Sequence, residues 1–173
     1  MRQVNTQILQ TSYGDLILGS HNNQLCLCDW LNRKKRESID LRIQTGLQAR
    51  YVEKSDEVLE STRVQLTEYF NGKRKFFDIP LLMVGTEFQQ SVWNGLLKIP
   101  FGVVSNYKSL SESINKIKAV RAVGSANGAN AISILIPCHR IIGSNGKLLG
   151  YAGGLNAKEN LLLLENNLFL SKG

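Results

Sequence analysis

The sequence predicts a two-part protein, with an α/β unit followed by a mainly helical unit that carries a helix-turn-helix. In the first half, two short apolar runs flank a polar turn and precede one long amphipathic pattern of helical period. In the second half most patterns are helical, and the change comes near Gly85. A length of 173 residues suits one ordinary domain or two small ones. We expect two, residues 1–84 and residues 85–173.

Residues 11–31 predict two short strands around a polar His-Asn-Asn turn, and the basic run at residues 32–38 predicts a solvated loop. Residues 55–75 predict a helix capped by Ser55. Five apolar residues would form its stripe: Val58, Leu59, Leu66, Tyr69 and Phe70. Residues 76–83 then predict an edge strand, because they contain Pro80.

The second half begins with a predicted helix whose N-cap is Thr86. Its inward residues would be Phe88, Val92, Leu96 and Leu97. Residues 106–130 predict two short helices with a turn near residues 115–118, the spacing of a helix-turn-helix. Residues 132–142 predict a strand broken by Pro137, and residues 147–167 predict a glycine-rich loop that leads into a last helix.

The charge differs between the halves. Residues 1–85 hold 12 Lys and Arg against 10 Asp and Glu, a net +2, whereas residues 86–173 hold 9 against 4, a net +5. A basic surface favours a polyanion such as nucleic acid, although a soluble basic protein without such a partner would have the same composition.

Several absences bear on location. No apolar run approaches the length of a membrane span, and the first residues lack the apolar core of a signal peptide. The three cysteines are an odd number and too few for a disulfide framework, which agrees with a reducing compartment. We therefore expect a cytoplasmic protein that does not enter membranes, by default a monomer.

Cys138 and His139 are the candidate reactive pair. They follow a proline in the run ILIPCHRII, and a histidine could take the thiol proton and leave a thiolate. Such a base needs an orienting acid, and the second half has only four: Glu87, Glu112, Glu159 and Glu165. The alternative is a buried structural cysteine beside a surface histidine. In an extended chain the two side chains would point to opposite faces, so a turn or a bridging water would have to couple them.

A metal site is a weaker hypothesis. Cys26, Cys28 and His21 could suggest zinc, but this spacing supplies no fourth ligand. Alternate residues of a strand share a face, so we expect both thiols in the core, His21 in the turn, and no metal.

The second half closely resembles the O6-alkylguanine-DNA alkyltransferases, the methylated-DNA–protein-cysteine methyltransferases. The resemblance rests on GTEFQQSVWNGLLKIPFG, SNYKSL, VRAVGSANGAN, ILIPCHRII and GYAGGLNAKENLLLLE, which together cover nearly all of residues 85–165. The first half is more weakly similar to the family's ribonuclease-H-like N-terminal domain. The resemblance implies a winged-helix-like second domain and irreversible transfer of an alkyl group from guanine O6, or from thymine O4, to the protein. No cofactor would be needed, and each molecule would act once.

The resemblance also implies a role for each matching residue. Cys138 would accept the alkyl group, His139 would act through a water as its base, and Glu165 would orient the histidine. Asn130 would brace the active-site turn. Tyr107 would press on the phosphate beside the target and help proton transfer to guanine.

The same resemblance implies how double-stranded DNA is bound. Arg121 would fill the stack left by a flipped base, and Ala122 and Gly124 would lie against the minor groove. These assignments agree with physical expectation, because the target atom is hidden in a duplex and only a helix of small residues can approach a narrow groove closely.

Tyr151 and Gly153 would shape the base pocket, and two neighbouring positions depart from the family's pattern. Ser133 and Ala152 stand where some members have proline and serine, and the frequent proline after Asn130 is also missing. We expect these changes to affect the range of substrates and to weaken reaction with bulky free bases.

Two other classes of protein remain open. A helix-turn-helix protein could bind DNA lesions without chemistry, but the family's lesion-binding relatives have tryptophan where this chain has Cys138. A cysteine hydrolase could use Cys138 and His139, but it would turn over and would not need a helix-turn-helix.

Overall fold

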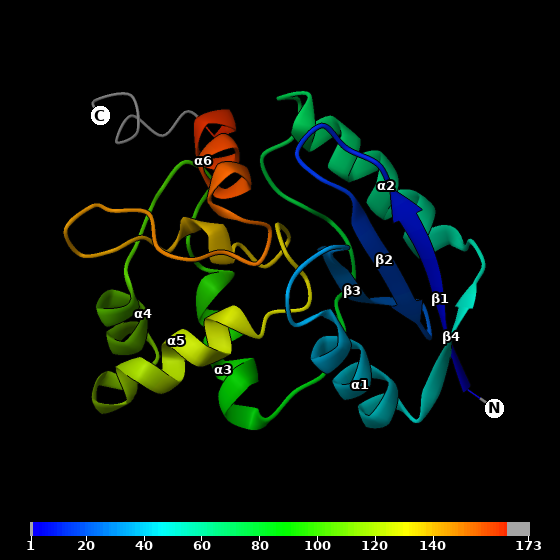
Figure 1. Ribbon diagram of the computed structural model, residues 1–173, viewed down its shortest axis with the longest axis horizontal. Coiled ribbons are helices and arrows are strands. Elements are labelled where there is room, and N and C mark those ends of the chain that lie inside the picture. Colours follow the sequence, from blue (N-terminus) through cyan, green and yellow to red (C-terminus); the bar gives the residue numbers. More distant parts are fainter. Residues whose placement is uncertain (1, 166–173) are drawn as a thin grey trace. The chain divides into compact units, whose positions relative to one another are not determined.

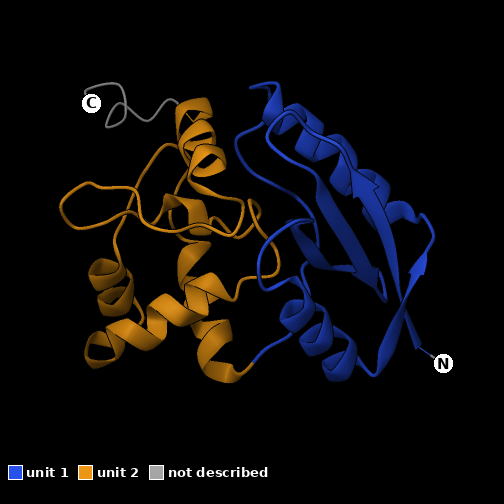
Figure 2. Cartoon of the chain, viewed as in Figure 1, with its two compact units in different colours: residues 1–85 blue, residues 86–173 orange. Residues whose placement is uncertain are grey.

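The structure, a computed structural model, describes residues 2–165 of the chain (Figure 1). It divides into two compact units, Met1–Gly85 and Thr86–Gly173 (Figure 2).

The first unit contains a four-stranded mixed sheet in the order β3-β2-β1-β4. The predicted hairpin, formed by β2 (Leu16–His21) and β3 (Gln24–Trp30), makes up one side of this sheet. The connecting Asn22 and Asn23 both have positive φ, 48° and 63°, as a tight two-residue hairpin turn requires. β1 (Arg2–Leu9) pairs antiparallel with β2, and β4 (Ala49–Glu53) pairs parallel with β1. The sequence patterns did not predict β1 and β4.

Two helices accompany this sheet, α1 (Arg36–Leu47) and α2 (Glu57–Phe70). α2 packs against β1, β2 and β3 through Leu59, Thr62, Leu66 and Tyr69. The predicted edge strand at residues 76–83 is reduced to a single bridge, in which Leu25 pairs with Leu81. Leu25 donates to the carbonyl of Pro80 and accepts from Leu82, so the segment adds only one step of pairing to β3.

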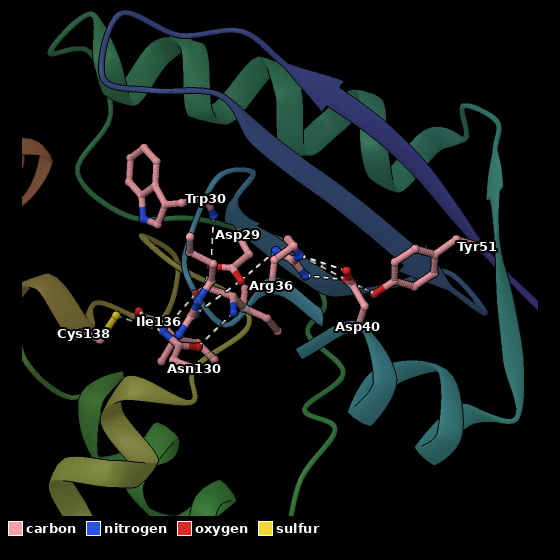
Figure 3. A network of polar contacts seen from close by, with 10 residues as sticks. Asp29, Trp30, Arg36, Asp40, Tyr51, Asn130, Ile136 and Cys138 are labelled. Carbon is pink, nitrogen blue, oxygen red and sulfur yellow. Dashed lines mark hydrogen bonds and ion pairs between the residues drawn. The ribbon is translucent and has the colours of Figure 1, made fainter. Parts of the chain in front are cut away.

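The predicted loop at residues 32–38 is wrong, because α1 begins within it. Asp29 is fully buried and accepts hydrogen bonds from Arg33 at 3.3 Å and from Arg36 at 2.8 Å. Arg36 also binds Asp40 at 2.6 Å, and the hydroxyl of Tyr51 donates to the same Asp40 oxygen at 2.8 Å (Figure 3). Burial raises the pKa of Asp29 and the two guanidinium groups oppose this rise. The basic run is therefore partly an internal ion-pair network that ties α1 to β3 and β4.

Cys26 and Cys28 both lie in the core, 1% and 0% exposed. Burial raises the pKa of the Cys26 thiol to about 12, so it stays protonated and unreactive. His21 is also buried and its Nδ1 lies 2.9 Å from the carbonyl oxygen of Gln3, so it ends a strand rather than standing in the turn. Among residues 2–165 no cluster of His, Cys, Asp or Glu has the arrangement of a metal site.

The second unit is helical, as predicted. α3 (Glu87–Leu96), α4 (Tyr107–Ser113) and α5 (Val120–Gly128) pack on one another, with the 3-10 turn η1 (Ile117–Ala119) before α5 (Figure 1). α4 and α5 form the predicted helix-turn-helix, and Asn115 in the turn has a φ of 58°. Gly95 allows the close approach of α3 and α4, since a Cβ there would lie 2.7 Å from a methyl carbon of Ile114. The 3-10 turn η2 (Cys138–Arg140) and α6 (Leu155–Leu164) complete the unit.

The start of α3 confirms the predicted cap. The Thr86 side chain accepts from the backbone of Gln89, and the Gln89 side chain accepts in return from the backbone of Thr86. The predicted inward face needs one correction: Leu97 is 42% exposed, and Trp93 is buried in its place, donating from Nε1 to the carbonyl of Ala126 at 2.8 Å. No helix among the described residues is long and apolar enough to cross a membrane.

The cap of α2 generates a first prediction. Asp56, not Ser55, is the N-cap, and its carboxylate accepts from the backbone of Leu59 and from the side chains of Asn5 and Ser20. Replacing Asp56 by alanine removes all three bonds, so we expect Asp56→Ala to lower the free energy of unfolding by about 2 kcal/mol. Urea unfolding followed by circular dichroism measures this. Ser55→Ala, the neighbouring control, should change it by less than about 0.5 kcal/mol; equal effects would mean that the cap assignment is wrong.

Candidate active site

The segment between α5 and η2 is a folded-back turn rather than the predicted strand. The backbone N–H of Leu135 donates to the carbonyl of Ser133 at 2.9 Å, and that of Cys138 donates to the carbonyl of Ile136 at 2.8 Å. Each bond closes a three-residue turn. In the second, Pro137 has φ −81° and ψ 62°, which its ring favours. In the first, Ile134 has a φ of 74°, which is rare for a β-branched residue.

Asn130 holds this turn from inside. Its side-chain N–H groups lie 2.9 Å from the carbonyl of Ile136 and 3.4 Å from that of Ile132, and its oxygen accepts from the backbone of Ile132 at 2.9 Å. The same nitrogen lies 3.3 Å from Sγ of Cys138 (Figure 3). Asn130 is only 2% exposed. The Asn130 side chain therefore makes the hydrogen bonds that a neighbouring strand would otherwise make with this backbone. Its N–H group also points at the Cys138 sulfur.

Cys138 and His139 lie in the turn η2, so the opposed faces of an extended chain do not apply. Nε2 of His139 is 2.8 Å from a carboxylate oxygen of Glu165, which can only accept, so Nε2 carries the hydrogen. Nδ1 then holds the lone pair. Nδ1 is buried and has no hydrogen-bond partner among residues 2–165. Burial lowers the pKa of His139, against the opposing effect of Glu165, so the ring is neutral at neutral pH and can act as a base.

Glu165 is the acid, out of the four candidates, that reaches the histidine. Besides His139 it binds Arg140 twice, at 2.9 and 3.0 Å, and Arg140 continues to the carbonyl of Ile99 at 2.7 Å. Glu165 is 2% exposed and Arg140 6%. Burial raises the pKa of Glu165, but the hydrogen bonds from His139 and Arg140 outweigh it and hold the pKa well below its usual range. The carboxylate is therefore charged, and it is paired on both oxygens.

The loop before α6 adds two groups. The ring of Tyr151 lies 6.4 Å from that of His139, in an edge-on arrangement. Lys158 is 1% exposed, its Nζ donates to the carbonyl of Leu149 at 3.2 Å, and burial lowers its pKa to about 8, against the charge of Cys138. Sequence reasoning missed Lys158. The signal was its position on the inward stripe of α6, with Leu161, Leu162 and Glu165.

The helix-turn-helix places Tyr107 at the start of α4, where Asn106 caps the helix. Burial raises the pKa of Tyr107, a hydrogen bond with Asn127 lowers it, and the charge of Cys138 raises it. On α5, Arg121 and Ala122 are exposed and Gly124 is half-buried. Of the four predicted pocket residues, Tyr151, Ala152 and Gly153 are half-buried and Ser133 is fully buried.

A thiol and a neutral imidazole, set in a braced turn beside a helix-turn-helix, define a class of protein that directs cysteine chemistry at DNA. Residues 87–167 match the family model described as the 6-O-methylguanine DNA methyltransferase DNA binding domain, and residues 5–83 match the ribonuclease-like domain of the same family. The chain belongs to the 6-O-methylguanine DNA methyltransferase family.

Curated relatives and solved structures agree with this assignment. The methylated-DNA–protein-cysteine methyltransferase of Methanosarcina barkeri is 45% identical over 92% of this chain and 96% of its own length. The inducible enzyme of Bacillus subtilis is 41% identical over 93% of this chain and 84% of its own. Mycobacterium tuberculosis OGT in complex with DNA has a TM-score of 0.80 and 35% identity, covering 96% of this chain and 99% of that one. The predicted fold, a ribonuclease-like domain followed by a DNA-binding domain, is confirmed.

The buried histidine generates a prediction about pH. Because the folded pKa of His139 lies below 6.5, its ordinary value, the unfolded chain binds this proton more tightly than the folded chain does. The free energy of unfolding should therefore fall as the pH drops below 6.5, until the folded pKa is reached. Glu165, whose folded pKa lies below 4.5, adds its own loss only below pH 4.5.

Urea unfolding at a series of pH values between about 7.5 and 5 tests this expectation. His139→Asn should be less stable at pH 7 but should lose less stability on acidification than the wild type. If the free energy of unfolding of His139→Asn falls with pH as steeply as that of the wild type, the lowered pKa of His139 is not the cause.

Proposed function

We propose that the protein repairs DNA by moving the alkyl group of O6-alkylguanine onto its own Cys138, once per molecule, with O4-alkylthymine as a second candidate substrate. The observation that carries the proposal is the pairing of a neutral, buried imidazole, with its Nδ1 lone pair available, and a neighbouring thiol in a turn held by Asn130. Double-stranded DNA is the proposed partner of the helix-turn-helix, and the protein acts as a monomer.

The chemistry begins with the thiol proton. His139 takes it at Nδ1 through one water, while Glu165 accepts from Nε2 and stabilises the charge that the ring acquires. The amide of Asn130 donates toward the resulting thiolate. Such donors are effective in a buried site, because no solvent competes with them.

The thiolate then attacks the alkyl carbon. A bond from sulfur to carbon forms, the bond from carbon to O6 breaks, and its electron pair stays with guanine. Tyr107 gives a proton to the departing base, whose negative charge would otherwise make it a poor leaving group. The product on Cys138 is a thioether. None of the described residues offers a route to cleave it, which is why a single turnover is expected.

Reaction inside a duplex requires that the base leave the stack, at a cost of a few kcal/mol. The exposed Arg121 would occupy the vacated space, and Ala122 and Gly124 would allow α5 to approach the minor groove. Tyr151, beside His139, would form a wall of the pocket that receives the base.

Duplex DNA that carries radiolabelled O6-methylguanine tests the function. Wild-type protein should take up one label per molecule, and Cys138→Ser should take up none while it still binds DNA. Cys26→Ser and Cys28→Ser are matched controls, because these buried thiols belong to the other unit, and both should accept label fully. Continued release of product would instead indicate a hydrolase, and DNA binding without label would indicate a lesion-binding protein.

Arg121 yields a separate prediction. If it holds the duplex open, Arg121→Ala should slow the reaction with methylated duplex by a factor of ten or more, and leave the reaction with free O6-methylguanine nearly unchanged. The free base has no stack to refill. Single-turnover rates with both substrates provide the measurement, and equal slowing would assign Arg121 a structural role.

A further inference from the structure

Asn127 is a buried polar residue that the mechanism above does not use. It lies near the end of α5 and is 6% exposed. Its side-chain oxygen is buried and has no hydrogen-bond partner among residues 2–165. Its side-chain nitrogen is not one of the buried atoms that lack a partner. Asparagine is a weak helix former, and an unpaired buried carbonyl costs stability. A leucine would serve a purely structural role better.

The geometry around Asn127 points to Tyr107. A Cβ at Gly124 would lie 3.8 to 4.0 Å from three carbons of the Tyr107 ring, so this ring lies against α5. Asn127 follows Gly124 by three residues and shares its helix face. The Asn127 side chain is a hydrogen-bond partner of the Tyr107 hydroxyl.

The direction of this hydrogen bond follows from the chemistry. The Asn127 oxygen has no partner among residues 2–165, so the bond to the phenol oxygen comes from the amide nitrogen, and this donated bond opposes the rise that burial causes in the pKa of Tyr107. Donation uses the amide nitrogen and leaves the amide oxygen without a partner, as observed. The phenol oxygen is then an acceptor from Asn127, and its own hydrogen remains available for another acceptor.

We propose that Asn127 is a positioning residue that holds Tyr107 ready to donate its proton to the departing base. The proposal rests on the proposed function. In the transfer step the sulfur–carbon bond forms, the carbon–O6 bond breaks, and the phenol proton moves to a ring nitrogen of guanine. The phenolate that remains accepts from Asn127 and is later reprotonated from the protonated His139 or from water. The hydrogen bond from the amide strengthens as charge develops on the phenol oxygen, so it stabilises the transition state more than the ground state.

A double-mutant cycle separates this role from a structural one. We would measure single-turnover methyl transfer from methylated duplex to wild type, Asn127→Leu, Tyr107→Phe and the double variant. Asn127→Leu should slow transfer about tenfold, the effect of one hydrogen bond to a charged oxygen. In the Tyr107→Phe background the same substitution should change nothing, because there is no hydroxyl to assist.

Iodomethane gives a second readout. It methylates the same Cys138, but iodide leaves without a proton, so wild type and Asn127→Leu should react with it at the same rate. If Asn127→Leu slows transfer equally in both backgrounds, or slows the iodomethane reaction as much as DNA repair, the residue is structural and the proposal is wrong. An unchanged rate of repair in Asn127→Leu also overturns it.

Two further controls complete the design. Asn127→Ser keeps a polar group that is too short to reach the hydroxyl, and it should behave like Asn127→Leu; if both variants lose DNA binding, the role is structural and the proposal falls. If the wild type itself takes up no label from methylated duplex, the proposed function fails first. That result is distinct from a wild type that reacts normally and an Asn127→Leu variant that matches it.

Discussion

The carboxylate of Glu165 lies directly after α6 and binds, through its two oxygens, both His139 and Arg140 of the reactive turn. Its Oε1 also accepts from the backbone N–H of Gly102, between α3 and α4, at 3.4 Å. One buried charge thus performs two tasks: it compensates a buried guanidinium, and it decides which histidine nitrogen carries the hydrogen. Removal of one partner from such a group leaves another charge unpaired in the interior, which typically costs several kcal/mol. The position of α6 and the protonation state of the base are consequently fixed by the same contact.

Burial also sets the proton affinities of the groups around the sulfur. It favours a neutral imidazole at His139, brings the pKa of Lys158 to about 8, and keeps Tyr107 protonated. Each shift has the sign expected when a charged form is taken out of water. The site therefore needs no external activator to hold a base with an open lone pair and an acid with its proton in place. The packed residues that stabilise the second unit therefore also set the proton affinities of its reactive groups.

Sequence patterns predicted the features that depend on residues close together in the chain. The turn at Asn22 and Asn23, the N-cap at Thr86 and the helix-turn-helix were all predicted, and the run around Cys138 located the site. Prediction failed where distant partners decide. α1 buries only Ile39 and Ile43 and depends on Asp29, so its sequence resembles a solvated loop. The apolar residues 131–136 resemble a strand, because their pattern carries no sign that the Asn130 side chain would take the place of a strand partner.

Ile134 shows how such a turn limits redesign of the protein. Its left-handed backbone costs about 1–2 kcal/mol relative to an ordinary conformation, and glycine would remove that cost. The side chain, however, is 1% exposed, and deleting a buried aliphatic group of this size costs about 2–5 kcal/mol. The exchange is neutral at best, so the common route of relieving positive φ with glycine offers no gain at this position.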